Sequence, residues 1–254
     1  MLLVIDAGNT NVTFGLFRGS ELLAQWRLTT DRNRSSDEYG AQVRSLFESA
    51  GSDVKEVEAV AIVSVVPPLN PSLMRMVETG FGLTPLVVDH TTDTGLKILY
   101  ESPSDLGADR IVDAVAAVTK YGAPCIVVDF GTSTNFDVVS AEGEYVGGVL
   151  APGIEISMDA LFERAARLRK VDFVEPPSVI GKTTVAALQS GVVYGFAGQV
   201  DGIVTAIRRE LGTDARAIAT GGLAELIYPH ASTIERVDPF LTLEGLRLVW
   251  ERNR

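Results

Sequence analysis

The sequence predicts an α/β protein built from two related halves. Residues 4–11 (VIDAGNTN) and 127–134 (VVDFGTST) share one pattern, in which an apolar run meets Asp-x-Gly and then three small polar residues. The aspartates of the two copies, Asp6 and Asp129, are separated by nearly half of the chain. Strands alternating with helices follow both copies, which is typical of largely parallel sheets. Such a repeat indicates duplication, with chance resemblance of two strand–turn segments as the alternative.

Each copy of the repeat opens a three-stranded meander. After the first copy, strands are expected at residues 12–17 and 22–28, joined by a turn that contains glycine. After the second copy, strands are expected at residues 136–139 and 145–150, again joined by a glycine-containing turn. The same order of strands and turns in both copies favours duplication over chance.

The rest of the first half alternates helices and strands. Residues 35–38 (SSDE) form a capping box, which starts a helix that ends at Gly51. Asn70 is expected to cap a helix with Pro71 at its first position. The other elements expected here are a buried strand at 57–66, a strand at 83–89 and a helix at about 107–120.

The second half continues in the same way. Its expected elements after the meander are helices at 153–168 and 184–211, a strand at 217–220 and a helix at 223–227. The halves are not separated by a linker rich in Pro, Gly or Ser, so the boundary is expected near residues 120–124. This gives an N-terminal half of residues 1–120 and a C-terminal half of residues 121–254.

Composition excludes several classes of function. The chain carries 33 acidic and 22 basic residues, a net charge of −11, which disfavours nucleic acid and anionic membrane surfaces as partners. Cys125 is the one cysteine, so an internal disulfide is impossible. With two histidines, a Cys/His zinc site and a Ser-His-Asp triad are both poor candidates. The first residues indicate a strand instead of a signal peptide, and we expect a cytoplasmic protein.

One expected helix is apolar enough to resemble a membrane span. Residues 184–207 nevertheless contain Gln189, Gln199 and Asp201, together with four glycines at positions 191, 195, 198 and 202. Small residues at such spacing allow another helix to approach closely. We therefore interpret this segment as a buried helix at a domain or subunit interface.

The first copy of the repeat is a candidate phosphate-binding turn. It follows a strand, at the sheet edge where ligands of α/β proteins gather. Gly8 allows backbone N–H groups to converge on an anion, and residues 9–11 (NTN) add side-chain donors. Asp6 could hold Mg²⁺, directly or through water, as the ion bridges phosphate oxygens. A simple hairpin with a polar turn is the alternative.

The second copy and a later Gly-Gly turn complete this pattern. Thr132 and its neighbours offer hydroxyls and amides to phosphates, and Asp129 again could serve a cation. Gly221 and Gly222 follow a strand and precede a helix, where a flat ring could lie against the backbone. An ordinary strand-to-helix turn is the alternative for these glycines.

Two further segments are candidates for acceptor binding. Asp109 is a carboxylate in the first turn of a helix, so it either stabilises the helix start or accepts a hydroxyl proton, with Arg110 orienting an anionic substrate. Residues 181–184 (GKTT) resemble a P-loop, but Pro176 stands where that motif needs its first glycine. Thr184 is then a helix cap or a hydroxyl offered to a ligand.

Together these residues resemble a known family. The segments that begin at Asp6, Gly107, Asp129 and Thr220 match, in order and spacing, the signatures of type III pantothenate kinases. The resemblance covers essentially the whole chain. It implies two duplicated ribonuclease-H-like halves of the actin, chaperone and sugar-kinase superfamily, with ATP in the cleft between them. It also implies transfer of the γ-phosphoryl group of ATP to the hydroxyl of pantothenate, the first step of coenzyme A synthesis.

The resemblance assigns a role to each candidate. Asp109 would be the proton acceptor, and Asp129 would bind the monovalent cation, K⁺ or NH₄⁺, that the family needs. Mg²⁺ would enter with ATP, near Asp6. The residues implied to bind ATP are Asp6, Ala7, Gly8, Asn9, Thr10, Asn11, Val12, Thr13, Thr132, Gly221 and Gly222. The residues implied to bind pantothenate are Tyr100, Gly107, Ala108, Asp109, Arg110 and Thr184. The family is homodimeric, and Thr184 would come from either subunit.

Two rival functions remain open at this point. One is another enzyme of the superfamily, either a sugar kinase or a phosphatase that hydrolyses polyphosphate. The other is a regulatory protein that binds ATP without turnover. The acidic balance of the chain argues against direct contact with DNA in that second case.

Overall fold

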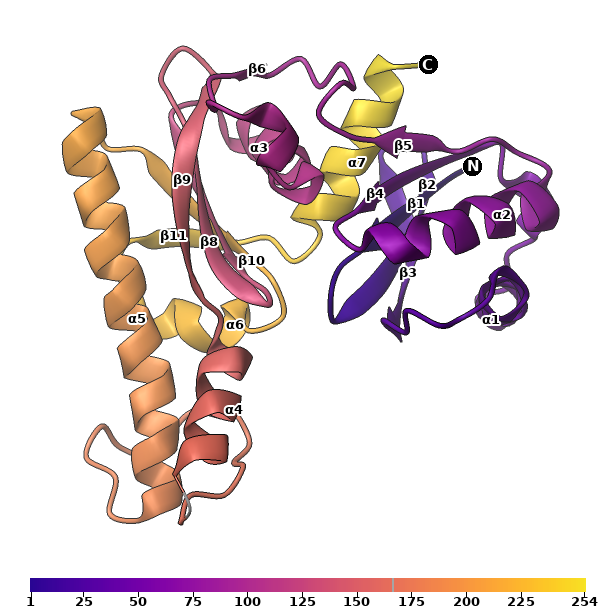
Figure 1. Cartoon of the computed structure of the whole chain (residues 1–254). Helices are drawn as coiled ribbons and strands as arrows, with labels where there is room; N and C mark the ends of the chain where they lie inside the picture. Colours follow the sequence, from indigo (N-terminus) through magenta and orange to yellow (C-terminus); the bar gives the residue numbers. More distant parts are fainter. Residues whose placement is uncertain (166) are drawn as a thin grey trace. The chain divides into compact units, whose positions relative to one another are not determined.

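The computed structural model describes residues 1–165 and 167–254 (Figure 1). The chain forms two compact units, each with one sheet. The first unit comprises Met1–Leu96, Glu101–Ala116 and Thr242–Arg254, and the second comprises Lys97–Tyr100 and Ala117–Leu241. Helices α3 (Ala108–Tyr121) and α7 (Leu241–Arg252) each contribute residues to both units.

The first sheet has five strands in the order β3-β2-β1-β4-β5. Their bounds are Leu2–Ala7 for β1, Asn11–Arg18 for β2, Glu21–Thr29 for β3, Ala59–Ser64 for β4 and Leu86–Val88 for β5. The first three strands form the antiparallel meander expected from the sequence, and β4 and β5 continue the sheet in parallel with β1. The expectation of parallel sheets apart from the opening meanders is confirmed here.

Helices cover both faces of the first sheet. Helices α1 (Ser36–Ser49) and α2 (Asn70–Phe81) pack on one face through buried Phe47 and Leu73, whereas α7 packs on the other. On that second face a Cβ atom at Gly15 would lie 3.1 Å from Cδ1 of Leu243 in α7. The capping box at the start of α1 is confirmed, because the side chain of Ser35 accepts from the backbone of Glu38 and the Glu38 side chain accepts in return.

The second sheet repeats the order of the first. Its six strands are ordered β11-β10-β7-β8-β9-β6, so the run from β11 to β9 corresponds to β5-β4-β1-β2-β3 of the first sheet. The bounds are Lys97–Ile98 for β6, Cys125–Phe130 for β7, Ser133–Val139 for β8, Glu144–Pro152 for β9, Arg216–Thr220 for β10 and Ile234–Val237 for β11. The shared topology, including the parallel pairs β7–β10 and β10–β11, confirms the duplication predicted from the repeat.

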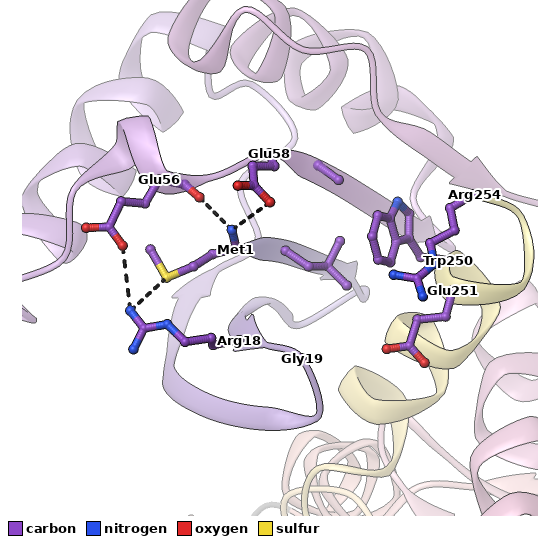
Figure 2. A pocket seen from close by; sticks show the side chains of 10 residues that line it. Met1, Arg18, Gly19, Glu56, Glu58, Trp250, Glu251 and Arg254 are labelled. Atoms are coloured by element: carbon purple, nitrogen blue, oxygen red, sulfur yellow. Dashed lines mark hydrogen bonds and ion pairs between the residues drawn. The ribbon is translucent and has the colours of Figure 1, made fainter.

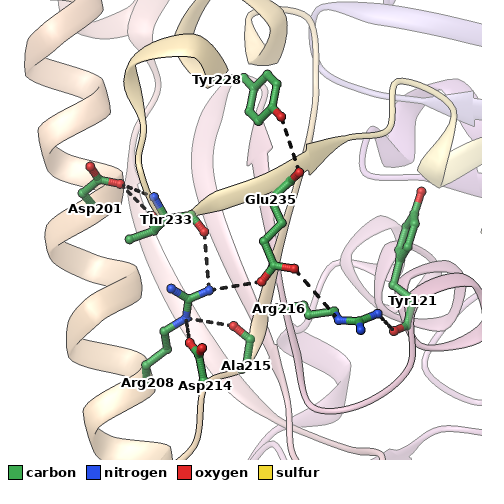
Figure 3. A network of polar contacts seen from close by, with 9 residues as sticks. All are labelled: Tyr121, Asp201, Arg208, Asp214, Ala215, Arg216, Tyr228, Thr233 and Glu235. Carbon is green, nitrogen blue, oxygen red and sulfur yellow. Dashed lines mark hydrogen bonds and ion pairs between the residues drawn. The ribbon is translucent and has the colours of Figure 1, made fainter.

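Three helices follow the second meander: α4 (Ile154–Arg164), α5 (Thr184–Leu211) and α6 (Ala224–Ile227). Buried side chains of α5, such as Val192 and Val200, join the core beneath β7 and β8. Arg208 of α5 donates to the Ala215 carbonyl at 2.9 Å and pairs with Glu235 of β11 at 3.5 Å (Figure 3). Asp201 of the same helix accepts hydrogen bonds from Ser232 and Thr233. These contacts connect α5 to β11 and to the residues just before β10 and β11.

Some elements differ from the sequence-based expectation. The cap of α2 is Leu69, not Asn70, because residues 67–69 form a 3-10 turn that leads directly into the helix. Helix α4 ends at Arg164, short of the expected 168, and residue 166 lies outside the described residues. The strand expected at 57–66 is limited to Ala59–Ser64. Strands β6 and β11 and helix α7 were not predicted.

Among the described residues, no helix is long and apolar enough to cross a bilayer.

Helix α5 has one open face. The glycines at positions 191, 195, 198 and 202 recur on one side of α5, and within the part of the chain that is described nothing approaches a Cβ built on them within 4 Å. The glycine stripe therefore has no packing role against the described residues of its own chain.

Candidate active site

The first turn of the repeat connects β1 to β2 at the end of a buried strand. The Gly8 amide donates to the Asn11 carbonyl at 2.9 Å, and a Cβ atom at Gly8 would stand 3.2 Å from that oxygen. Glycine is therefore favoured here by the closeness of the turn. Asn9 and Thr10 are exposed at its tip. Such a turn presents backbone amides and short polar side chains to an anion.

The residues that flank this turn contribute in different ways. Asp6 is half-buried and lies opposite Thr13 in the β1–β2 pair. Ala7 and Val12 are fully buried in the core of the first unit. Their side chains are thus committed to packing, and only their backbone groups could meet a nucleotide.

The carboxylate of Asp6 suits a metal ion that takes its other ligands from phosphate oxygens. Across the described residues, no group of three or more His, Cys, Asp or Glu side chains could hold a metal ion. A single carboxylate such as Asp6 fits Mg²⁺, which keeps several waters and takes its other ligands from phosphate oxygens. The chain therefore fits a divalent ion that arrives with the nucleotide.

Val65 joins the first turn to the segment that begins at Gly107. Its amide donates to the Ala7 carbonyl at 3.0 Å, at the ends of β1 and β4. Its side chain approaches Gly107, where a Cβ atom would lie 3.6 Å from Val65 Cγ1. The segment before α3 therefore lies at the same strand-end edge as the β1–β2 turn. This edge therefore carries the segments of two candidates that are distant in the sequence, Asp6 and Asp109.

Asp109 is held at the first turn of α3. Its Oδ1 atom accepts from the Arg110 amide at 2.8 Å, and a Cβ atom at Gly107 would stand 2.5 Å from that oxygen. Gly107 thus leaves room for the carboxylate. Desolvation raises the pKa of Asp109 above its usual value, although the adjacent Arg110 amide and guanidinium oppose the shift. A carboxylate with a raised pKa is a better proton acceptor at neutral pH.

In the second unit, the structure brings Asp129, Gly131 and Gly221 together. Asp129 of β7 pairs with Thr220 of β10, so the second turn and the Gly-Gly turn begin side by side. A Cβ atom at Gly131 would lie 3.1 Å from Asp129 Oδ2, and one at Gly221 would lie 2.5 Å from Asp129 Oδ1. Thr132 is exposed at the tip of the turn. The second copy of the repeat and the Gly-Gly turn, both predicted for this half, thus form two adjacent turns around one carboxylate.

The remaining candidates of the second unit lie elsewhere on it. Tyr100 is partly exposed and stacks edge-on against Tyr145, with ring centroids 6.4 Å apart. The helix cap of α5 is Thr183, whose side chain accepts from the Ala186 amide at 3.1 Å. The interpretation of Thr184 as the cap was therefore wrong, and its exposed position leaves the hydroxyl open to a ligand.

Sequence reasoning missed two residues that support the turns. Thr30 donates to two carbonyls of the first turn, and Gly153 packs so closely on the second that a Cβ atom would meet the Thr132 carbonyl. Each follows the third strand of its meander. The repeat of three strands could have pointed to these positions, because the third strand lies beside the second and ends near the turn.

A cavity of about 460 Å³ in the first unit is separate from these residues (Figure 2). It is lined by residues at the starts of β1 and β4, such as Leu2 and Ala59, and by Trp250 of α7. Arg18 and Glu56 form an ion pair at its rim, 3.6 Å apart. The β1–β2 turn follows the opposite end of β1, so the cavity is not part of the candidate site.

Comparisons with known proteins agree with this geometry. A family model described as type III pantothenate kinase matches residues 2–206. A type III pantothenate kinase of Moorella thermoacetica is 53% identical over 253 residues, and one of a Roseiflexus species is 51% identical over 254 residues. Both matches cover all of this chain and all of the relative.

Solved structures give the fold. A Campylobacter jejuni protein proposed to be a Baf family transcriptional activator has a TM-score of 0.60 at 18% identity, covering 99% of this chain and 98% of its own. Component A of the (R)-2-hydroxyglutaryl-CoA dehydratase of Acidaminococcus fermentans has a TM-score of 0.56 at 14% identity, covering 100% and 99%. The fold is that of the actin-like ATPases and sugar kinases.

Proposed function

This chain belongs to the type III pantothenate kinases, and from that premise we propose how its own residues carry the reaction. The enzyme phosphorylates pantothenate with ATP in coenzyme A biosynthesis. Both ATP and a divalent metal belong to this activity. The observation that supports the proposal is that Val65, whose amide donates to the Ala7 carbonyl beside the β1–β2 turn, also approaches Gly107, two residues before Asp109.

In our proposal the N-terminal half (1–120) and the C-terminal half (121–254) each bind part of the ATP molecule. The turn from Asp6 to Thr13 in the first half binds the phosphates of ATP, and Asp6 serves the Mg²⁺ that accompanies them. In the second half Thr132 binds phosphate, and Gly221 and Gly222 lie against the adenosine. Phosphoryl transfer depends mainly on such positioning and charge neutralisation.

Asp109 acts as the proton acceptor. Its carboxylate takes the proton of the pantothenate hydroxyl as that oxygen bonds to the γ-phosphorus of ATP, while the bond from the γ-phosphorus to the β–γ bridging oxygen breaks and ADP leaves. Gly107, Ala108 and Arg110 bind pantothenate around it, and the Arg110 guanidinium pairs with the substrate carboxylate. Tyr100 and Thr184 provide further contacts to the same substrate.

Asp129 binds a monovalent cation, K⁺ or NH₄⁺. Its partly buried carboxylate between the Gly131 and Gly221 backbones supports this role, because the two glycines let the chain approach the charge closely. The open glycine stripe of α5 supports a homodimer. Dependence on ATP supports a cytoplasmic enzyme.

Steady-state kinetics on two variants test the assignment of the binding segments. Asn9→Ala should raise the KM for ATP and leave the KM for pantothenate near its normal value. Arg110→Gln should do the reverse. The wild-type enzyme should release ADP when pantothenate is the acceptor. It should release no ADP with a panel of sugars or in the absence of an acceptor. If either variant changed the KM of the wrong substrate, the corresponding segment would be misassigned.

A further inference from the structure

Thr30 holds the β1–β2 turn from outside the repeat. It is the first residue after β3, and it is partly buried. Its hydroxyl donates to the Gly8 carbonyl at 2.6 Å, and its backbone amide donates to the Thr10 carbonyl at 3.0 Å. One residue therefore binds two carbonyls of the same turn.

These two bonds determine which way the amides of the turn face. In a trans peptide the C=O and N–H groups of one plane point in opposite directions. Among the described residues, the bond between Ala123 and Pro124 is the only cis peptide. The Gly8 carbonyl shares its plane with the Asn9 amide, and the Thr10 carbonyl shares its plane with the Asn11 amide. With both carbonyls directed at Thr30, both amides point away from it.

We propose that Thr30 is a positioning residue of the ATP site, which orients the Asn9 and Asn11 amides toward the nucleotide phosphates. This inference rests on the proposed role of the β1–β2 turn. Successive amides that face one side form a concave anion site, whereas carbonyls on that side would repel phosphate. Thr30 keeps the carbonyls on the other side.

The second turn of the repeat lacks this arrangement. On β9, the third strand of this meander, the residue opposite Ser133 of the turn is Pro152. Proline has no N–H, so it cannot donate to the turn as the Thr30 amide does. There the Gly131 amide donates to the Ser133 carbonyl at 3.1 Å, and Gly153 packs against the Thr132 carbonyl. The two turns are similar in sequence but are held differently, so the role of Thr30 is specific to the first turn.

The test is a set of kinetic measurements on the full-length enzyme. Thr30→Val keeps the shape and the backbone amide of the residue and removes only the hydroxyl. We expect the KM for ATP to rise about 3- to 10-fold, the equivalent of one hydrogen bond. The KM for pantothenate and the inhibition constant of adenosine, which has no phosphates, should stay unchanged. Thr30→Ser restores the hydroxyl and should restore the KM for ATP.

A matched control and an independent variant make the result unambiguous. Thr29→Val makes the same chemical change at the neighbouring, exposed residue of β3 and should leave both KM values unchanged. If Thr30→Val does not fold, the pair Thr30→Ser and Thr30→Ala gives the same comparison of hydroxyl against none. Asn9→Ala alters the turn itself and tests whether that turn binds ATP.

The outcomes separate the two levels of the proposal. An unchanged KM for ATP in Thr30→Val, with Asn9→Ala impaired, overturns the role of Thr30 alone. No effect of either variant on the KM for ATP overturns both the role of Thr30 and a contact of the Asn9 side chain with ATP. Equal losses for ATP and adenosine, or a Thr30→Ser enzyme that behaves like Thr30→Val, would mean that Thr30 contributes packing and does not orient the amides.

Discussion

The carboxylate of Asp129 lies directly against the backbone of Gly221. A Cβ atom at Gly221 would stand 2.5 Å from Asp129 Oδ1 and 2.6 Å from the Phe130 carbonyl carbon. Gly221 also has a φ of 94°, a conformation that L side chains rarely adopt. The Gly-Gly turn and the β7–β8 turn are thus one tightly packed structure.

We expect Gly221→Ala to impair both stability and ATP binding. The positive φ alone costs about 1–3 kcal/mol, and the added methyl group must displace Asp129 or the Phe130 backbone. The melting temperature should fall by several degrees, and the KM for ATP should rise. Gly222→Ala is the matched control for stability, because its Cβ atom meets no described atom within 4 Å, and its melting temperature should be near normal.

Replacing Na⁺ by K⁺ should raise the turnover number. The proposed cation ligand is Asp129, so Asp129→Asn should reduce the difference between the two buffers as well as the rate itself. Both buffers need the same ionic strength, since screening alone changes the binding of charged substrates. Equal wild-type rates in K⁺ and Na⁺ would count against a cation at Asp129.

The open glycine stripe predicts a dimer through α5. Light scattering should give twice the chain mass of 27.2 kDa. Gly198→Leu should weaken the dimer, because a large side chain prevents the close approach that small residues permit. Gly80→Leu is the control, since Gly80 also lies in a helix, α2, with no described atom within 4 Å of its Cβ position. A wild-type monomer at working concentration would refute the dimer.

Asp201 should contribute to stability at neutral pH and lose that contribution in acid. Desolvation alone would raise the pKa of Asp201, but the hydrogen bonds from Ser232 and Thr233 outweigh it and hold the pKa below the usual value. The folded state therefore binds this proton less readily than the unfolded state. The resulting stabilisation is complete above the unfolded pKa of about 3.9 and disappears as the pH falls through the lower folded value.

Thermal melting of Asp201→Asn tests this pH dependence. At pH 7 the variant should melt about 5 °C lower, because losing a hydrogen-bonded charged acceptor costs about 1–3 kcal/mol. The difference from wild type should shrink below about pH 4. Asp214→Asn is the matched control: Asp214 pairs with Arg208 at 3.0 Å, but its side chain is 89% exposed, so the change should be close to neutral. A constant difference at all pH values would assign the effect to packing.

The sequence predicted those parts of the fold that depend on local patterns. The two meanders follow from strand–turn repeats, and the start of α1 follows from its capping box. Helix α7 was missed, although buried Leu243, Leu246 and Val249 recur along it at helical spacing. Its Gly245 packs so closely on α3 that a Cβ atom would meet the Val112 carbonyl, a contact that no local pattern contains.

The same distinction applies to the site. Asp6, Asp109 and Asp129 stand out because an Asp-x-Gly pattern or a helix start marks each of them in the sequence. Thr30 does not stand out, because its role lies in bonds to a turn about 20 residues earlier in the chain, a separation that local pattern rules do not cover. Thr183 and Thr184 could not be told apart as caps, since either hydroxyl satisfies the pattern and only the helix start decides.

Asp109→Asn should abolish most turnover and leave ATP binding largely intact. Asn is nearly isosteric with Asp and cannot accept the hydroxyl proton. General-base catalysis typically contributes about 10²- to 10⁴-fold, so the turnover number should fall on that scale. The melting temperature should not fall. Burial raises the pKa of Asp109, so the ionised carboxylate is less favourable in the folded chain than in the unfolded one, and neutral Asn relieves that cost at pH 7.

Three measurements separate this role from a helix-end role. A residue that only stabilises the start of α3 would show a lowered melting temperature with near-normal turnover in the variant. Asp105→Asn is the matched control, because Asp105 is an exposed carboxylate just before the same helix and should change neither quantity. The pH profile of the wild-type enzyme gives the third measurement. Because the proton acceptor must be ionised and its pKa is raised, the acid limb of kcat/KM should lie above the ordinary Asp value of about 3.9. An acid limb at or below that value would leave the reaction without Asp109 as its base.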